Sequence, residues 1–134
     1  MTLIESTNII KKFVGTQQMK VMKEYCKGEE GEFFKTEITR LAELITTMPK
    51  TYETDNQGWK AVAHLHYFTS NWDFYITELD KNKDQHQAFG ITNGFDLELG
   101  YINIPDILKN GAELDLHWKP KTIEEIREEA SFNS

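Results

Sequence analysis

Residues 61–80, AVAHLHYFTSNWDFYITELD, contain two runs of β-forming residues on either side of a Ser-Asn pair. Aromatic and β-branched residues that flank a short polar pair are typical of a β-hairpin. With a two-residue turn at Ser-Asn, two apolar pairs lie opposite each other, Leu65–Ile76 and Tyr67–Phe74. A one-residue slip would mix apolar and polar side chains on both faces, so burial favours this register.

The first third of the chain has the apolar spacing of helices. Apolar residues recur at helical intervals over residues 7–25, with Gly15 as the expected break, and again over residues 33–48 after a loop at 28–32. The second segment carries an amphipathic stripe formed by Phe34, Ile38, Leu41, Ile45 and Met48. Such a stripe suits packing on the protein's own sheet, or the interface of a homodimer formed through the N-terminal helices.

The remaining segments predict more short strands and two helices. The hairpin strands are expected at 59–68 and 71–79, and further strands at 86–92, 98–104 and 113–118. A short helix is expected at 105–110. A terminal helix is expected at 119–130, with Thr122 as its N-cap and Glu125 in a capping box. Consecutive strands with short turns favour an antiparallel sheet of about five strands. The helices are expected to cover one of its faces. The predicted fold class is α+β in a single domain, residues 1–134, with a helical part (1–50) and a β-rich part (51–134).

Negative charge is concentrated in the β-rich part. Residues 1–50 carry eight Lys/Arg and seven Asp/Glu, whereas residues 51–134 carry seven and fifteen, which is a net charge of −8. Such a surface repels nucleic-acid phosphates, so direct binding of duplex DNA is not expected, and a basic protein partner suits it better. The chain has a single cysteine, no apolar run long enough to span a membrane and no signal-peptide pattern at its start. We therefore expect a cytoplasmic protein without membrane contact.

Alternation also gives the hairpin a second, more polar face, which carries His64, His66, Asp73 and Tyr75. A fifth strand at 113–118 would place Asp115 and His117 on one of its own faces. If both polar faces lie on the same side of the sheet, these histidines and carboxylates converge. Two histidines and a carboxylate are typical ligands of zinc or iron, and a histidine beside a carboxylate suits general acid–base catalysis.

The histidine spacing is nevertheless a weak signal. Alternation along a strand places any pair of residues two apart on one face, and the more specific metal motifs are absent from the sequence. No cofactor is predicted on this basis. A divalent metal held by His64, His66 and Asp115 stays open as an alternative.

The aromatic residues of the hairpin have two interpretations. Tyr67, Trp72 and Tyr75 would suit a stacking platform for single-stranded nucleic acid. Such platforms normally lie in a basic groove, and residues 61–80 contain no lysine or arginine. Packing within the hairpin and the core is therefore favoured.

Several strand motifs occur in a recognisable order: SNWDFYITELD at 70–80, AFG at 88–90, ELGY at 98–101 and ELDLHW at 113–118, preceded by MPKTYETD and HLHYF. This set resembles a family of plasmid and mobile-element proteins, domain of unknown function twenty-nine fifty-eight, over roughly residues 48–128. The resemblance implies cargo of plasmids, conjugative elements and phages, near genes for antirestriction and DNA processing. It identifies no catalytic residue. The acids that match the family pattern are Glu78, Asp80, Glu98 and Asp115, which implies either a functional role or a structural role at turns and strand ends.

These observations favour a small acidic accessory protein of a plasmid, phage or conjugative element that acts by binding a protein partner. The setting would be counter-defence, of the anti-restriction or anti-CRISPR type, or DNA processing, and the partner would be basic or would handle nucleic acid. The expected binding residues are Asp73, Tyr75, Glu78, Asp80 and Glu98. An enzyme is not favoured. The alternatives are a metal-dependent hydrolase or nuclease that uses His64, His66 and Asp115 with His117 or Glu98, and a binder of single-stranded nucleic acid.

Overall fold

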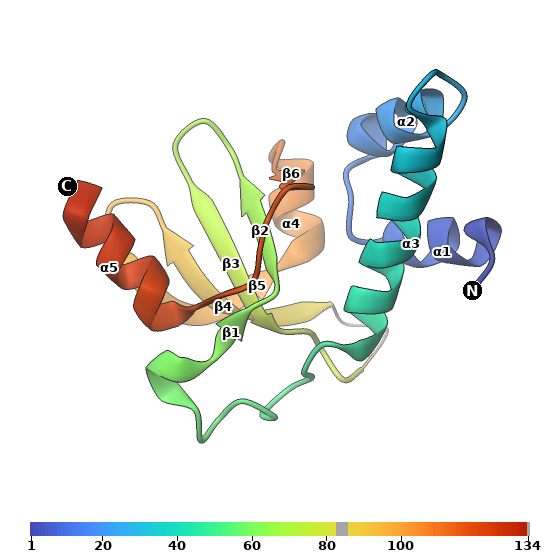
Figure 1. The fold of residues 1–134 in the computed structure, drawn as a ribbon. Coiled ribbons are helices and arrows are strands. Elements are labelled where there is room, and N and C mark those ends of the chain that lie inside the picture. The colour runs from blue at the N-terminus through green and yellow to red at the C-terminus, as the bar shows by residue number, and fades with distance from the viewer. Residues whose placement is uncertain (83–85, 134) are drawn as a thin grey trace.

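The computed structural model describes residues 1–82 and 86–133 and shows a five-stranded antiparallel sheet between two sets of helices (Figure 1). The sheet has the order β5-β4-β3-β2-β6, and its strands are β2 (Leu65–Phe68), β3 (Asp73–Glu78), β4 (Gln87–Asn93), β5 (Leu97–Asn103) and β6 (Glu113–Leu114). A separate ladder joins β1 (Val62–Ala63) to β7 (Lys121–Thr122). The helices are α1 (Leu3–Ile10), α2 (Thr16–Tyr25), α3 (Gly31–Thr47), the 3₁₀ helix η1 (Gly58–Lys60), α4 (Ile104–Lys109) and α5 (Ile123–Asn133). The fold class is α+β, as predicted.

The β2–β3 hairpin has the predicted register. Leu65 pairs with Ile76, and Tyr67 pairs with Phe74. The Thr69 N–H donates to the Trp72 carbonyl at 2.8 Å, which closes the two-residue turn. Leu65, Tyr67 and Ile76 are at most 2% exposed, so the apolar face of the hairpin is the core face of the sheet.

The N-terminal helices pack on this core face. The stripe of α3 is buried there through Ile38, Leu41, Ile45 and Met48, in one cluster with Leu65 and Tyr67 of β2. The stripe therefore serves the protein's own core. The Tyr67 hydroxyl donates to the Phe13 carbonyl, and burial raises the pKa of Tyr67 far above its ordinary value. Gly15 separates α1 from α2, as the sequence predicted.

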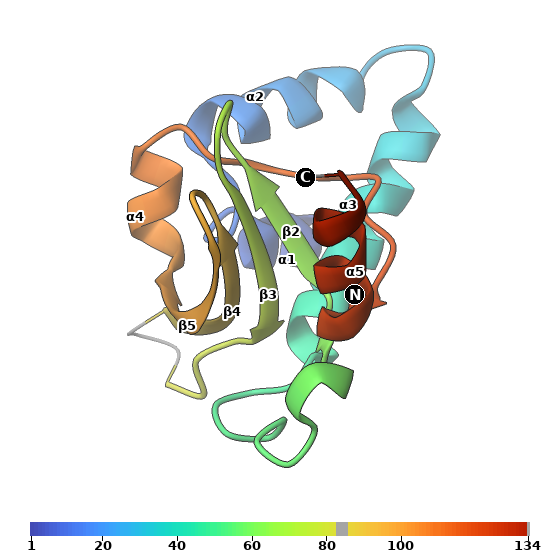
Figure 2. The same ribbon diagram turned by 90° about the vertical axis from the view of Figure 1, so that its left-hand side faces the viewer.

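The terminal helix α5 lies on the opposite face of the sheet (Figures 1 and 2). Ile123 packs there with Ala61 and Ile91 in a second, smaller cluster. Since strand neighbours alternate, Ile91 of β4 faces away from the core side that Ala88 contacts. The expectation that the helices cover one face was therefore wrong. The capping box is confirmed, because the Glu125 N–H donates to Thr122 Oγ1 at 3.1 Å and the Thr122 N–H donates to Glu125 Oε1 at 3.2 Å.

Three predicted boundaries need correction. The strand expected at 113–118 is only two residues long, because the chain turns away after Leu114. The Asp115 carboxylate accepts from the His117 N–H at 3.0 Å, which is the local hydrogen bond of an Asx turn. The strand expected at 59–68 is a 3₁₀ turn followed by β1 and β2, and α3 begins inside the loop expected at 28–32.

No helix in the described part of the chain is both long enough and apolar enough to cross a bilayer.

Two glycines that face each other across β4 and β5 provide a matched test of sheet packing. Gly90 pairs with Gly100. A Cβ on Gly90 would lie 1.8 Å from the Tyr75 carbonyl oxygen, whereas a Cβ on Gly100 would meet no atom within 4 Å. We expect Gly90→Ala to lower the free energy of unfolding by roughly 2–4 kcal/mol, because backbone must move to relieve the clash. Gly100→Ala should leave it unchanged or raise it slightly. Chemical denaturation of both variants gives the comparison, and equal effects would contradict it.

Candidate functional site

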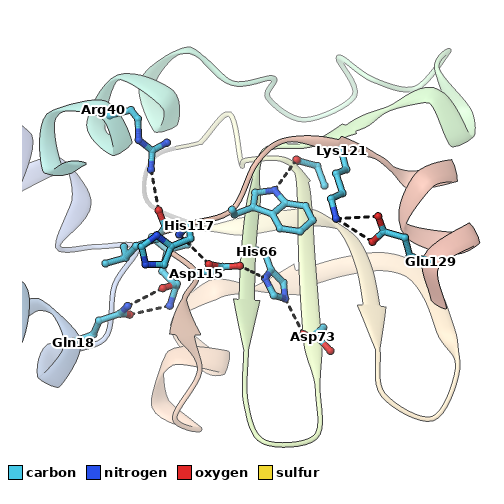
Figure 3. Close-up of polar contacts among 12 residues, drawn as sticks. Gln18, Arg40, His66, Asp73, Asp115, His117, Lys121 and Glu129 are labelled. Atoms are coloured by element: carbon cyan, nitrogen blue, oxygen red, sulfur yellow. Dashed lines mark hydrogen bonds and ion pairs between the residues drawn. The ribbon is translucent and has the colours of Figure 1, made fainter. Parts of the chain in front are cut away.

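The His66 ring lies between two carboxylates on the polar face of the hairpin (Figure 3). Nδ1 is 2.9 Å from Asp115 Oδ2, and Nε2 is 2.8 Å from Asp73 Oδ1. Asp73 comes from β3 of the same hairpin, whereas Asp115 follows β6 near the end of the chain. The structure therefore brings His66 and Asp115 together, a proximity that the sequence left open.

Aromatic rings pack against the histidine and against each other. The Tyr75 ring stacks on it at 4.7 Å between centroids and 11° between planes, and the Trp118 ring lies 5.0 Å away. The His66 side chain is only 12% exposed as a result. Burial raises the pKa of Tyr75 to about 12, with further contributions from the negative charges of Asp73, Glu129 and Asp115.

These contacts decide what the His66 ring can do. Each ring nitrogen lies within hydrogen-bond distance of a carboxylate oxygen, so both are already engaged inside the protein. Within residues 1–82 and 86–133, no group of three or more His, Cys, Asp or Glu side chains is arranged to hold a metal ion. The ring instead links the hairpin to the segment that follows β6.

That segment, residues 113–118, is held by contacts from distant parts of the chain (Figure 3). The Gln18 side chain donates to the Leu114 carbonyl and accepts from the Leu114 N–H, both at 2.8 Å. Arg40 donates to the Leu116 carbonyl at 3.3 Å. The Trp118 indole donates to the Ala63 carbonyl at 3.0 Å. Sequence reasoning missed Gln18, Arg40 and the position of Trp118, because no local pattern marks partners 55 to 96 residues apart.

The other two candidate histidines do not share this environment. His64 lies between β1 and β2, where its N–H donates to the Ile76 carbonyl at 2.9 Å and burial lowers the pKa of its half-buried ring. His117 is exposed beyond the turn at Asp115. Its side chain makes no hydrogen bond within the described residues. The fifth strand, β6, ends at Leu114 and does not align Asp115 with His117, so that part of the prediction was wrong.

The remaining candidate acids have three different environments. Glu78 is 4% exposed, and its carboxylate accepts from the Tyr52 N–H at 3.0 Å and the Thr54 N–H at 2.8 Å, so it holds the loop before η1. Asp80 accepts from the backbone N–H groups of Asn82 at 2.9 Å and Gln87 at 3.0 Å. Glu98 is exposed on β5. Of these three acids, only Glu98 is exposed and available to a partner.

The aromatic platform expected for single-stranded nucleic acid is not assembled. Tyr67 is 0% exposed and belongs to the core, so no base can stack on it. Tyr75 is covered by His66 and Trp118. Trp72 is 39% exposed at the hairpin turn, where it contacts Phe95 of the next turn at 5.8 Å between ring centroids.

No protein-family model, no curated protein and no solved structure matches this chain. The resemblance to the mobile-element family therefore stays a prediction.

The role of His66 as a link predicts a specific loss of stability. His66→Ala removes the ring that contacts both carboxylates and leaves Asp73 Oδ1 and Asp115 Oδ2 without their shared partner. We expect the free energy of unfolding to fall by about 2–4 kcal/mol. His117→Ala is the matched control and should change it by less than about 0.5 kcal/mol, because that ring is exposed. Urea denaturation measures both, and a similar small change for the two variants would show that His66 is not a structural link.

Burial of His64 predicts a pH dependence of stability. Because burial lowers the pKa of His64 below its usual 6.5, the unfolded chain takes up a proton at a higher pH than the folded chain. The free energy of unfolding should therefore decrease as the pH falls through about 6.5 and level off below the folded pKa. His64→Gln should remove this part of the dependence. A histidine titration by NMR that places the midpoint of His64 at or above 6.5 would contradict the expectation.

Proposed function

We propose that this protein is a non-enzymatic binding domain that pairs the free edge of β5 with an extended, basic segment of a partner protein. The observation that carries the proposal is the contrast between the two edges of the sheet. Extended segments bind to open strand edges through backbone hydrogen bonds, and pockets for alternate side chains supply specificity.

One edge of the sheet is occupied and the other is not. At the β6 edge the strand is two residues long. The side-chain amide of Gln18 forms hydrogen bonds with both the N–H and the carbonyl of Leu114. At the opposite edge, β5 is seven residues long and pairs, within the described residues, with β4 alone. Figure 2 shows β5 at the outer border of the sheet. Its pairing with β4 has no bulge over all seven residues.

The side chains of β5 are also unusual for an unprotected edge. Leu99 is 51% exposed and Tyr101 is 55% exposed, on the face opposite the N-terminal helices. The strand sequence LELGYIN contains no lysine, arginine or proline. Natural edge strands usually carry such residues or a bulge, because an open apolar edge pairs readily with another chain. β5 carries one charged residue, Glu98, and neither a proline nor a bulge, which supports a binding role for this edge.

Charge indicates the kind of segment that would bind. Residues 51–134 carry a net charge of −8. Glu98 is exposed on β5 itself, and Asp96 is exposed in the turn before it. Helix α5, which packs on the same face as Leu99, adds the exposed Glu124 and Glu128. A segment with alternating basic and apolar residues would match both the charge and the apolar side chains.

The resemblance to plasmid and phage cargo adds an expectation about the partner. A protein that handles nucleic acid, such as a nuclease or another defence component, has basic segments of the required kind. Blocking such a segment would be a form of counter-defence. The enzymatic alternative has less support, because both nitrogens of His66 contact carboxylates.

A defined peptide tests the edge directly. A synthetic peptide of alternating lysine and valine, about as long as β5, should shift the amide resonances of β5 in an NMR titration, and added salt should weaken binding. Leu99→Lys should reduce the affinity by about tenfold, since it replaces an exposed apolar contact with a repelling charge. Ile4→Lys is the matched control, because Ile4 is 76% exposed on α1 and away from the sheet edge.

The outcome is decisive in either direction. Shifts confined to other elements, or equal effects of the two variants, would exclude β5 as the binding edge. Capture of a host protein by the unmodified chain at low salt, lost in Leu99→Lys and kept in Ile4→Lys, would extend the result to a natural partner.

A further inference from the structure

A cavity of about 400 Å³ lies between the N-terminal helices and the sheet. Its apolar lining comes from three parts of the chain: Ile9 and Phe13 from α1 and the turn after it, Ile45 from α3, and Leu79, Ala88 and Ile104 from the sheet side. The volume falls within the range of small-molecule sites, about 300–1,000 Å³. The cavity is large enough for a small ligand with an apolar body.

Two lysines are among the polar residues that line this cavity, together with Thr46 and Asn82. Lys12, Lys50 and His86 line it, with Asp80 as the single acid among the described lining residues. Both oxygens of Asp80 already accept backbone N–H groups, at 2.9 Å and 3.0 Å. The exposed Lys12 forms no ion pair with another described residue. Its ammonium is available to an anion.

Lys50 favours anion binding at this cavity through its contacts with the end of α3. Its ammonium donates to the Met48 carbonyl and lies 3.4 Å from the carbonyls of Ile45 and Thr46, at the C-terminal end of α3. These carbonyls carry the partial negative charge of the helix end, and a cation placed on them offsets the repulsion that an anion would meet. Burial lowers the pKa of Lys50, and a bound anion would counteract that effect.

We propose that this cavity binds a medium-chain fatty acid. The tail lies among Ile9, Ile45 and Ile104, and the carboxylate lies at Lys12, with Lys50 and His86 beside it. An apolar cavity with cations at its mouth is complementary to a ligand of this shape and charge. A neutral apolar ligand would leave the lysines unused, and a small anion would leave the apolar volume unfilled.

The cavity is independent of the β5 edge. Ala88 and Ile102 are paired and lie on the core face of the sheet, whereas Tyr101 and Leu99 point to the other face. Fatty-acid binding therefore does not rest on the proposed partner binding. Leu99→Lys should leave it unchanged, which keeps a failure of one proposal distinct from a failure of the other.

Calorimetric titration of the full chain with octanoate and decanoate tests the proposal. Each added pair of methylenes should tighten binding by about tenfold, because the tail is buried. Decanol, which has the same tail without the charge, should bind at least tenfold more weakly than decanoate. In parallel NMR titrations, decanoate should shift the methyl groups of Ile9, Ala88 and Ile104.

Variants of two neighbouring lysines give the matched comparison. Lys12→Glu should weaken decanoate binding by at least tenfold, and Lys12→Arg should retain it. Lys11→Glu makes the same charge change next to the site, at a lysine that does not line the cavity, and should have little effect. Thermal unfolding should show that all three variants remain folded. Absence of saturable decanoate binding, equal binding of decanol, or equal losses in Lys11→Glu and Lys12→Glu would overturn the proposal.

Discussion

The pairing of β2 with β3 is the interaction on which the rest of the structure depends. Its register sends Leu65, Tyr67 and Ile76 to the side where the N-terminal helices pack, and sends His66 and Tyr75 to the side of α5. A shift by one residue would bury the imidazole among aliphatic side chains and expose the apolar pairs to water. Both clusters of the protein, and the position of the His66 link, follow from this one alignment.

The sequence contains enough information for this alignment, and for other features governed by neighbours in the chain. Two-residue turns, capping boxes and amphipathic stripes all depend on residues a few positions apart, and each was predicted at its observed place. The segment 113–118 shows where local reasoning fails. Its alternation suits a strand, yet Asp115 makes a turn with the His117 N–H and contacts His66, 49 residues away. A pairing between segments so far apart leaves no mark in either one.

The same limit explains why the candidate site was only partly predictable. Proximity of His66 to Asp115 follows from the order of the strands, and the sequence allowed it. The engagement of both ring nitrogens requires Asp73 from the same hairpin as well as Asp115, and the Trp118 ring packs against the histidine. Those contacts change the interpretation of the motif. They turn a set of residue types suited to metal binding into a link that stabilises the fold.

The two edges of the sheet also differ in how many side chains hold them in place. The β6 edge is tied down by Gln18, Arg40 and the His66 link, so its backbone groups are occupied before any partner arrives. The β5 strand, within the described residues, pairs with β4 alone, and Leu99 and Tyr101 are both exposed there. An open edge carries a cost, because it invites aggregation. The surrounding negative charge reduces that cost by repelling other copies of the same chain, while it attracts basic segments. In the proposed binding role, the acidity of the β-rich part selects basic segments over other copies of the same chain.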